Sequence, residues 1–269
     1  MGGFHGTIFS RTLKMDIGVS VILPQDSRKH RGVEPLASGI VPRKTSKTLL
    51  LLHGLGDNHT AWMNKTGIYR YAEEHDIAVI MPEVHRSFYQ NMYYGHAFET
   101  FIAEELPQVM GNMFHISTEP EDLMIAGLSM GGYGALYLGL KYPEKFCAIG
   151  AFSGAVDIVG LVNAQKAAID REDLYSPLDT LCAFGPADGR DLEKADVYHW
   201  LEEAMKKEVH VPIFLSAGAE DPIYPLTEKF AETLKDKHYA PFVFHTLPGT
   251  HDWDVWDTSI QMFLKETLE

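Results

Sequence analysis

Short apolar runs recur along the chain, and segments with helical spacing separate them. Hydrophobic residues at consecutive positions, bounded by glycine or turn residues, are typical of strands buried on both faces of a parallel sheet. The runs are KTLLLLHG (47–54), IAVIMPEV (77–84), EDLMIAG (121–127), FCAIGAFSG (146–154), VPIFLSAG (211–218) and PFVFHTLPG (241–249). Strands that alternate with helices predict a mostly parallel central sheet with helices on both faces.

The N-terminal region has a different pattern, in which apolar and polar residues alternate. TIFSRTL (7–13) and IGVSVILP (17–24) read as two strands of a hairpin that turns near residues 14–16. The segment 26–35 is polar and basic, and it is expected to be an exposed loop. Helical spacing predicts helices over about 62–75, 96–114, 131–143 and 226–237, with a last one from about Trp253. Pro107 should kink or divide the second of these.

One long segment interrupts the alternation of strands and helices. Residues 155–207, after the strand that ends near Gly154, have helical pieces and turn signals but no clear strand. A small cap-like insertion is therefore predicted here. The chain shows no repeat, linker or low-complexity tract, so residues 1–269 are expected to form a single α/β domain.

Composition narrows the function classes. The 269 residues carry a formal charge of −14, which disfavours nucleic acid and anionic membranes as partners. Two cysteines, Cys147 and Cys182, give no disulfide framework. The N-terminus lacks a signal-peptide core, and no run reaches the roughly 20 apolar residues of a membrane span, so a cytoplasmic protein is expected. The oligomeric state stays open, since an acidic surface does not prevent a symmetric homodimer.

Candidate chemistry begins at IAGLSMGGYGAL (125–136), where Ser129 lies in a G-x-S-x-G motif between a predicted strand and a predicted helix. Gly127, Gly131 and Gly132 surround this serine. A strand-to-helix turn that lifts a serine above a sheet brings backbone segments so close that only small residues fit. The motif therefore predicts a tight turn with Ser129 as a nucleophile.

A serine hydroxyl needs a base to take its proton and a carboxylate to orient that base. Reactive groups of an open parallel sheet gather at the carboxyl ends of strands. Asp221 follows the strand PIFLSAG, and His251 follows FVFHTLPG. The order Ser129, Asp221, His251 along the chain is the order of the α/β-hydrolases. These three residues are the predicted catalytic triad.

The stabilisation of negative charge on the substrate carbonyl oxygen is assigned to backbone amides. His53-Gly54-Leu55-Gly56 follows an early predicted strand. In α/β-hydrolases this loop gives one oxyanion N–H, and the residue after the nucleophile gives the other. The predicted donors are the amides of Leu55 and Met130.

Several neighbouring residues compete for these roles. Glu220, Asp252 and Asp254 are alternative carboxylates, but Asp221 has the position after the penultimate strand, and Asp252 is predicted to cap the last helix. Ser153 also ends a strand, but it lacks the glycine two residues earlier and is read as structural.

Most of the 13 histidines must be structural. His53 is expected to pack or hydrogen-bond under the oxyanion loop, and His245 to be a sheet residue. No H-E-x-x-H or similar spacing occurs, so neither a metal nor another cofactor is predicted. Near one strand end, Phe88, Tyr93 and Tyr94 are candidate walls of the substrate pocket, with ordinary core packing as the equal alternative.

The combined motifs resemble the esterase D family, which includes tributyrin esterases, S-formylglutathione hydrolases and acetyl and feruloyl esterases. The resemblance rests on HGLGDNHTAW, YYGHAFETFIAEELPQV, MIAGLSMGGYGAL, AFSGAVD, GAEDPIY and GTHDWDVW. It implies a cytoplasmic serine carboxylesterase for small-molecule esters with short acyl chains, acetyl to butyryl. The chain has Gly56-Asp57-Asn58 where S-formylglutathione hydrolases carry a T-C-T-like stretch, which argues against a glutathione thioester.

Two other classes compete with this prediction. An acyltransferase would use the same triad with an alcohol in place of water, as the related mycolyltransferases do. A non-catalytic binding protein on the same fold would have lost a triad residue or the oxyanion loop, and neither loss is seen.

Overall fold

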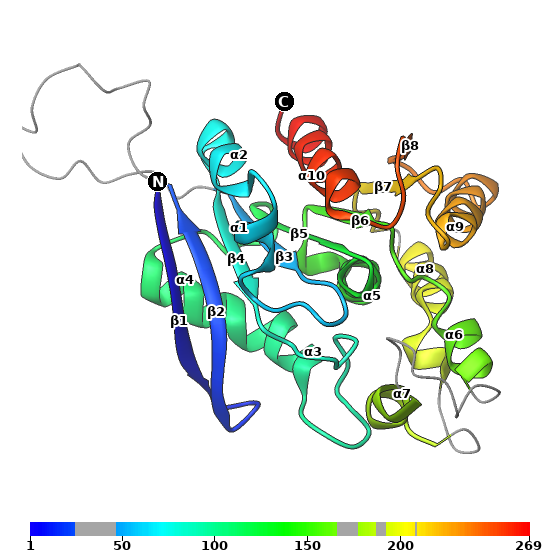
Figure 1. The fold of residues 1–269 in the computed structure, drawn as a ribbon, viewed down its shortest axis with the longest axis horizontal. Helices are drawn as coiled ribbons and strands as arrows, with labels where there is room; N and C mark the ends of the chain where they lie inside the picture. The colour runs from blue at the N-terminus through cyan, green and yellow to red at the C-terminus, as the bar shows by residue number, and fades with distance from the viewer. Residues whose placement is uncertain (25–46, 166–176, 187–191, 208) are drawn as a thin grey trace, which may run out of the picture.

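The computed structural model describes residues 1–24, 47–165, 177–186, 192–207 and 209–269, and its centre is an eight-stranded sheet (Figure 1). Its strands lie in the order β1-β2-β4-β3-β5-β6-β7-β8. They are β1 (Gly2–Ser10), β2 (Met15–Leu23), β3 (Thr48–Leu52), β4 (Ala78–Pro82), β5 (Leu123–Leu128), β6 (Ala148–Phe152), β7 (Ile213–Gly218) and β8 (Phe242–Leu247). β2 is antiparallel to both β1 and β4, and the other neighbouring strands pair in parallel. The predicted mostly parallel sheet is confirmed.

The predicted N-terminal hairpin forms, but its first strand begins earlier, at Gly2, and its turn lies at residues 11–14 rather than near 14–16. β1 pairs with β2 from Gly2 opposite Leu23 to Ser10 opposite Met15, and four residues make the turn. β2 then pairs antiparallel with β4, which attaches the hairpin to the parallel strands. The loop predicted at 26–35 lies outside the described residues.

The strand side chains alternate between two apolar layers. In β3, Leu50 and Leu52 belong to one buried cluster, while Leu49 and Leu51 belong to the other. The second layer is covered by α1 (Ala61–Lys65), α2 (Ile68–His75) and α10 (Trp253–Leu268). The first is covered by α4 (Leu106–Phe114), α5 (Met130–Lys141), α8 (Val197–Lys206) and α9 (Tyr224–Asp236). Because helices cover both layers, the strands with continuous apolar runs are buried on both faces of the sheet.

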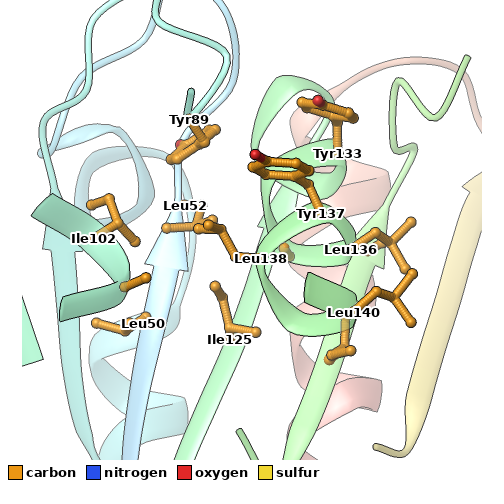
Figure 2. Close-up of a cluster of buried hydrophobic side chains, with 14 of the residues drawn as sticks. Leu50, Leu52, Tyr89, Ile102, Ile125, Tyr133, Leu136, Tyr137, Leu138 and Leu140 are labelled. Atoms are coloured by element: carbon orange, nitrogen blue, oxygen red, sulfur yellow. The ribbon is translucent and has the colours of Figure 1, made fainter. Parts of the chain in front are cut away.

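Helix α5 occupies the middle of the first layer. Residues 130–140 are all buried, because the sheet covers one side of the helix and α8 packs on it from another. Figure 2 shows Leu138 directed toward Leu52 and Ile125 of the sheet, with Tyr133 and Tyr137 stacked along the helix. This packing fixes the N-terminal end of α5, where the serine motif lies.

The helical segment before β5 carries the predicted irregularity near Pro107. It consists of α3 (Phe98–Thr100), a π-helical turn (Phe101–Glu105) and α4. Pro107 falls in the first turn of α4, where a proline is tolerated. The predicted division is therefore seen as a change in helical hydrogen bonding.

The described parts of 155–207 are helical and contain no strand. They comprise α6 (Ile158–Gln165), α7 (Pro177–Phe184), a 3₁₀ turn (Leu192–Ala195) and α8. Their role as a cap, and the organisation of residues 1–269 as one domain, stay predictions. Across the described chain, no helix combines the length and the apolar character that a bilayer crossing requires.

Candidate active site

Ser129 lies in the turn between β5 and α5. Its backbone has φ 52° and ψ −114°, a left-handed φ that a non-glycine residue adopts only at a cost of about 1–3 kcal/mol. A Cβ at Gly127 would lie 2.5 Å from Gly131 O, and a Cβ at Gly131 would lie 2.5 Å from Leu52 O. Neither position has room for a side chain. The close backbone approach explains the glycines of the motif.

Three side chains from separate loops meet at the carboxyl edge of the sheet. Ser129 follows β5, Asp221 follows β7, and His251 lies between β8 and α10. His251 Nε2 is 3.0 Å from Ser129 Oγ, and His251 Nδ1 is 2.8 Å from Asp221 Oδ2. With Nδ1–H donating to the carboxylate, Nε2 is free to accept the serine proton. The structure thus brings the three predicted residues into one hydrogen-bonded chain.

The Asp221 side chain is buried and held as a carboxylate. Its Oδ1 accepts from the backbone N–H of Ile223 at 2.9 Å, and its exposed fraction is 0%. Burial alone would raise the pKa of Asp221, but the hydrogen bonds from His251 and from the backbone N–H of Ile223, together with the nearby Ser153 hydroxyl, outweigh burial and lower the pKa. A charged carboxylate can hold the imidazole and stabilise an imidazolium.

The rival carboxylates have other positions. Asp252 Oδ1 accepts from the backbone N–H groups of Asp254 and Val255, both at 3.1 Å, so it caps α10 as predicted. Asp254 lies in the first turn of the same helix, and Glu220 is exposed. Asp221 is therefore the carboxylate that His251 contacts.

The loop after β3 passes directly beside the nucleophile. A Cβ at Gly54 would lie 3.7 Å from Ser129 Cβ. Met130 is the first residue of α5, so its amide has no partner within the helix. The amides assigned to Leu55 and Met130 thus belong to the two segments that flank the serine hydroxyl.

Two buried side chains hold that loop in place. His53 Nδ1 lies 2.8 Å from Gly54 O, and the backbone N–H of Val84 donates to His53 Nε2 at 3.2 Å. Tyr89 Oη donates to His53 O at 2.8 Å. His53 supports the loop from beneath, as predicted. Tyr89 was missed, because it lies in an irregular segment whose residues follow no periodicity.

The three aromatic residues predicted near the pocket contact α7, and two of them contact each other. Tyr93 and Tyr94 are each 56% exposed and pack edge-to-face, with ring centres 4.6 Å apart. Their backbone amides donate to Ala183 and Cys182 of α7. Phe88 is buried against Phe184, as core packing requires. A role for the two tyrosines in a pocket stays a prediction.

Two further predictions concern His245 and a metal site. His245 Nε2 lies 2.8 Å from Glu266 Oε1 of α10, which agrees with a sheet residue. Among the described residues, no group of three or more His, Cys, Asp or Glu side chains is arranged to hold a metal ion.

The chain is similar to known esterases. A family model described as "Putative esterase" matches residues 10–266. The acetyl esterase of Caldicellulosiruptor saccharolyticus is 28% identical over 259 residues, which cover 94% of this chain and 92% of that protein.

Solved structures from Staphylococcus aureus are also similar. The fluorophosphonate-binding serine hydrolase F has a TM-score of 0.84 and 30% identity, and covers 100% of this chain and 98% of its own. An S-formylglutathione hydrolase has a TM-score of 0.82 and 29% identity, and the match covers 100% of this chain and 99% of that hydrolase.

Proposed function

Because the chain belongs to this esterase family and is a carboxylic ester hydrolase of the α/β-hydrolase fold, we propose that it cleaves short-chain acyl esters through Ser129, His251 and Asp221. The observation that carries the proposal is the chain of contacts from Ser129 Oγ to His251 Nε2 at 3.0 Å and from Nδ1 to Asp221 Oδ2 at 2.8 Å. This order of contacts, from hydroxyl to imidazole to carboxylate, supports a role in acyl transfer.

In the first half-reaction, Ser129 Oγ attacks the ester carbonyl carbon while His251 Nε2 takes the hydroxyl proton. Negative charge develops on the carbonyl oxygen, and the amides of Leu55 and Met130 donate to it. Each such donor is typically worth about 3–4 kcal/mol in the transition state. The C–O bond to the alcohol then breaks, and His251 returns the proton to the leaving oxygen. An acyl-enzyme on Ser129 remains.

In the second half-reaction, His251 takes a proton from water, whose oxygen attacks the acyl carbon. The same two amides stabilise the second oxyanion. Collapse releases the carboxylic acid and returns the proton to Ser129 Oγ. The cycle needs no cofactor, because it consists of the formation and cleavage of C–O bonds at the acyl carbon and of proton transfers through His251, with no change of oxidation state.

The preference for acetyl to butyryl chains is supported by the acetyl esterase relative, which is 28% identical to this chain. We assign the exposed pair Tyr93 and Tyr94 to the outer wall of the substrate pocket. A closed pocket rejects long chains by steric exclusion, since each buried methylene changes binding by only about 0.8 kcal/mol.

The test is a survey of kcat/KM on p-nitrophenyl esters from acetyl to dodecanoyl, with the S129A variant as the control. Rates should fall sharply beyond about six carbons, and S129A should be inactive on all of them. A smooth rise toward long chains would overturn the specificity, and turnover by folded S129A would overturn the mechanism. Acetylated sugars, S-formylglutathione and added alcohol acceptors extend the survey to the competing substrates and to acyl transfer.

A further inference from the structure

The indole of Trp256 packs against the imidazole of His251. The ring centres are 4.9 Å apart, the planes are nearly perpendicular at 88°, and Trp256 is only 6% exposed. Both residues flank the start of α10, which Asp252 caps. A capped first turn holds Trp256 in a fixed position relative to the preceding loop.

Trp256 does not contribute through its polar atom. Within the described part of the chain, its buried Nε1 has no hydrogen-bond partner. A buried donor left without an acceptor is unfavourable, so the site gains nothing from the indole N–H. The aromatic ring is the feature that remains to explain a tryptophan at this position.

The same contact extends into a row of three tryptophans. Trp253 lies edge-to-face with Trp256 at 5.2 Å and with Trp62 at 5.3 Å. Trp62, which is 1% exposed, donates its indole N–H to Leu52 O at 3.0 Å. Leu52 is the last residue of β3, immediately before the oxyanion loop. The row therefore connects the base with the loop assigned to the oxyanion.

His251 needs a support that does not change during the reaction. Among the described residues, the polar contacts of its ring are to Ser129 and Asp221, and its side chain is 28% exposed. The contact to Ser129 Oγ is altered when that oxygen is acylated. The remaining contact, at Nδ1, fixes one atom and leaves the plane of the ring free to tilt. A perpendicular aromatic surface restricts that tilt at every stage.

We infer that Trp256 is a positioning residue that holds the His251 ring in its working orientation, and that Trp253 and Trp62 extend this support to the oxyanion loop. The inference rests on the proposed function, since it presumes that His251 is the base. The positioning role belongs to the aromatic ring of Trp256, and its indole N–H takes no part.

The first test compares W256F, which keeps an aromatic ring, with W256L, which does not. Steady-state and pre-steady-state kinetics on p-nitrophenyl acetate are measured well below the Tm of each variant. W256F should stay within about threefold of wild type, whereas W256L should lose about 10- to 100-fold in kcat with little change in KM, as expected for a misplaced catalytic group. Trp200 of α8 packs on Tyr137 and provides the matched control W200L.

The second test does not depend on activity and uses indole emission, which a protonated imidazole in contact quenches. His199 packs on Trp200 at 5.0 Å, so the titration is done in a W200F background. Emission should fall on acidification, and the midpoint of this fall should match the midpoint of kcat/KM against pH, measured on p-nitrophenyl acetate with the same protein. The added changes W256F and H251Q should each remove this step.

The outcomes separate the two proposals. If S129A is inactive but W256L is as active as wild type, the positioning role is wrong while the proposed function stands. Equal losses in W256F and W256L, or an unchanged emission step in W256F, would likewise overturn the role. If folded S129A still turns over, the proposed function fails and this inference fails with it.

Discussion

Two serines occupy equivalent places at the ends of neighbouring parallel strands. Ser129 directly follows β5, and Ser153 directly follows β6. Both have a left-handed backbone, with φ 52° and 46°. Each N–H donates to a carbonyl of the next strand in the sheet, from Ser129 to Phe152 at 2.9 Å and from Ser153 to Ser216 at 2.7 Å. Backbone strain alone does not distinguish them.

The surroundings of the two serines distinguish them. Ser129 is 6% exposed, is followed by a helix, and its Oγ faces His251 Nε2. Ser153 is 0% exposed, and its hydroxyl acts on the carboxylate of Asp221. Two strand ends with the same backbone conformation therefore differ in their side-chain partners, and of the two hydroxyls it is the Ser129 hydroxyl that faces an imidazole. The neighbouring copy of the same turn instead supports the acid.

The largest expected difference between the two serines is in turnover. S129A should lower kcat by about a million-fold, since removal of a triad nucleophile has effects of that size. S153A should remain an active esterase. Labelling with a fluorophosphonate checks the assignment directly, because wild type and S153A should be modified at Ser129 and S129A should not be modified. A label on Ser153 would contradict it.

The second difference concerns the carboxylate that Ser153 supports. D221N should lower kcat by about ten-thousand-fold, because an amide at this position favours the wrong imidazole tautomer. D252N is the matched control, since Asp252 only caps α10, and an asparagine caps almost as well. Measuring kcat of both variants at one pH tests this prediction. A greater loss of kcat in D252N than in D221N would show that the carboxylate partner of His251 is misassigned.

Much of this arrangement was predictable from local pattern. The continuous apolar runs of β3 to β7 are buried on both faces and therefore show no alternation, which is the signal for parallel strands. Ser129, Asp221 and His251 could be grouped because the carboxyl ends of parallel strands share one edge. The position of each residue directly after a predicted strand was sufficient to group the three.

The residues that contact and hold the site residues could not be predicted from local pattern. Tyr89 is 0% exposed and Tyr93 is 56% exposed, although both lie in one irregular aromatic segment with no period to separate inside from outside. The perpendicular contact of Trp256 with His251 depends on where α10 begins relative to the loop. The left-handed φ of Ser153 occurs where its N–H donates to Ser216 of β7, and no G-x-S-x-G motif predicts it.

The third difference is a smaller effect on the acid itself. The Ser153 hydroxyl lies close enough to lower the pKa of Asp221, although within the described residues it makes no well-aligned hydrogen bond. S153A should therefore raise the pKa of Asp221 and lower kcat by a few-fold. A hydrogen bond to a charged group is worth about 1.5–3 kcal/mol, and an imperfect one less, so roughly 1 kcal/mol of stability should be lost near neutral pH.

The sign of the pH dependence follows from the lowered pKa of Asp221. Its stabilisation is present above the unfolded-state pKa of about 3.9 and is lost as the pH falls through the folded-state value. The stabilities of wild type and S153A should therefore differ at pH 7 and converge in acid. Urea unfolding at several pH values measures this. S216A is the control, since Ser216 is equally buried but bonds Ser259, and its deficit should not depend on pH.

The smallest effect tests whether the two turns are equally strained. At a left-handed φ, glycine is favoured over alanine by roughly 1 kcal/mol, because alanine has a Cβ that crowds the backbone in that region. S129G should therefore be more stable than S129A, and S153G more stable than S153A, by similar amounts, since the two φ angles differ by only a few degrees. Thermal unfolding of the four variants gives both differences without reference to activity. Alanine more stable than glycine at either position would mean that the left-handed backbone there is wrong. A clear preference for glycine at Ser129 alone would mean that only the nucleophile turn is strained, and the equivalence of the two strand ends would fail.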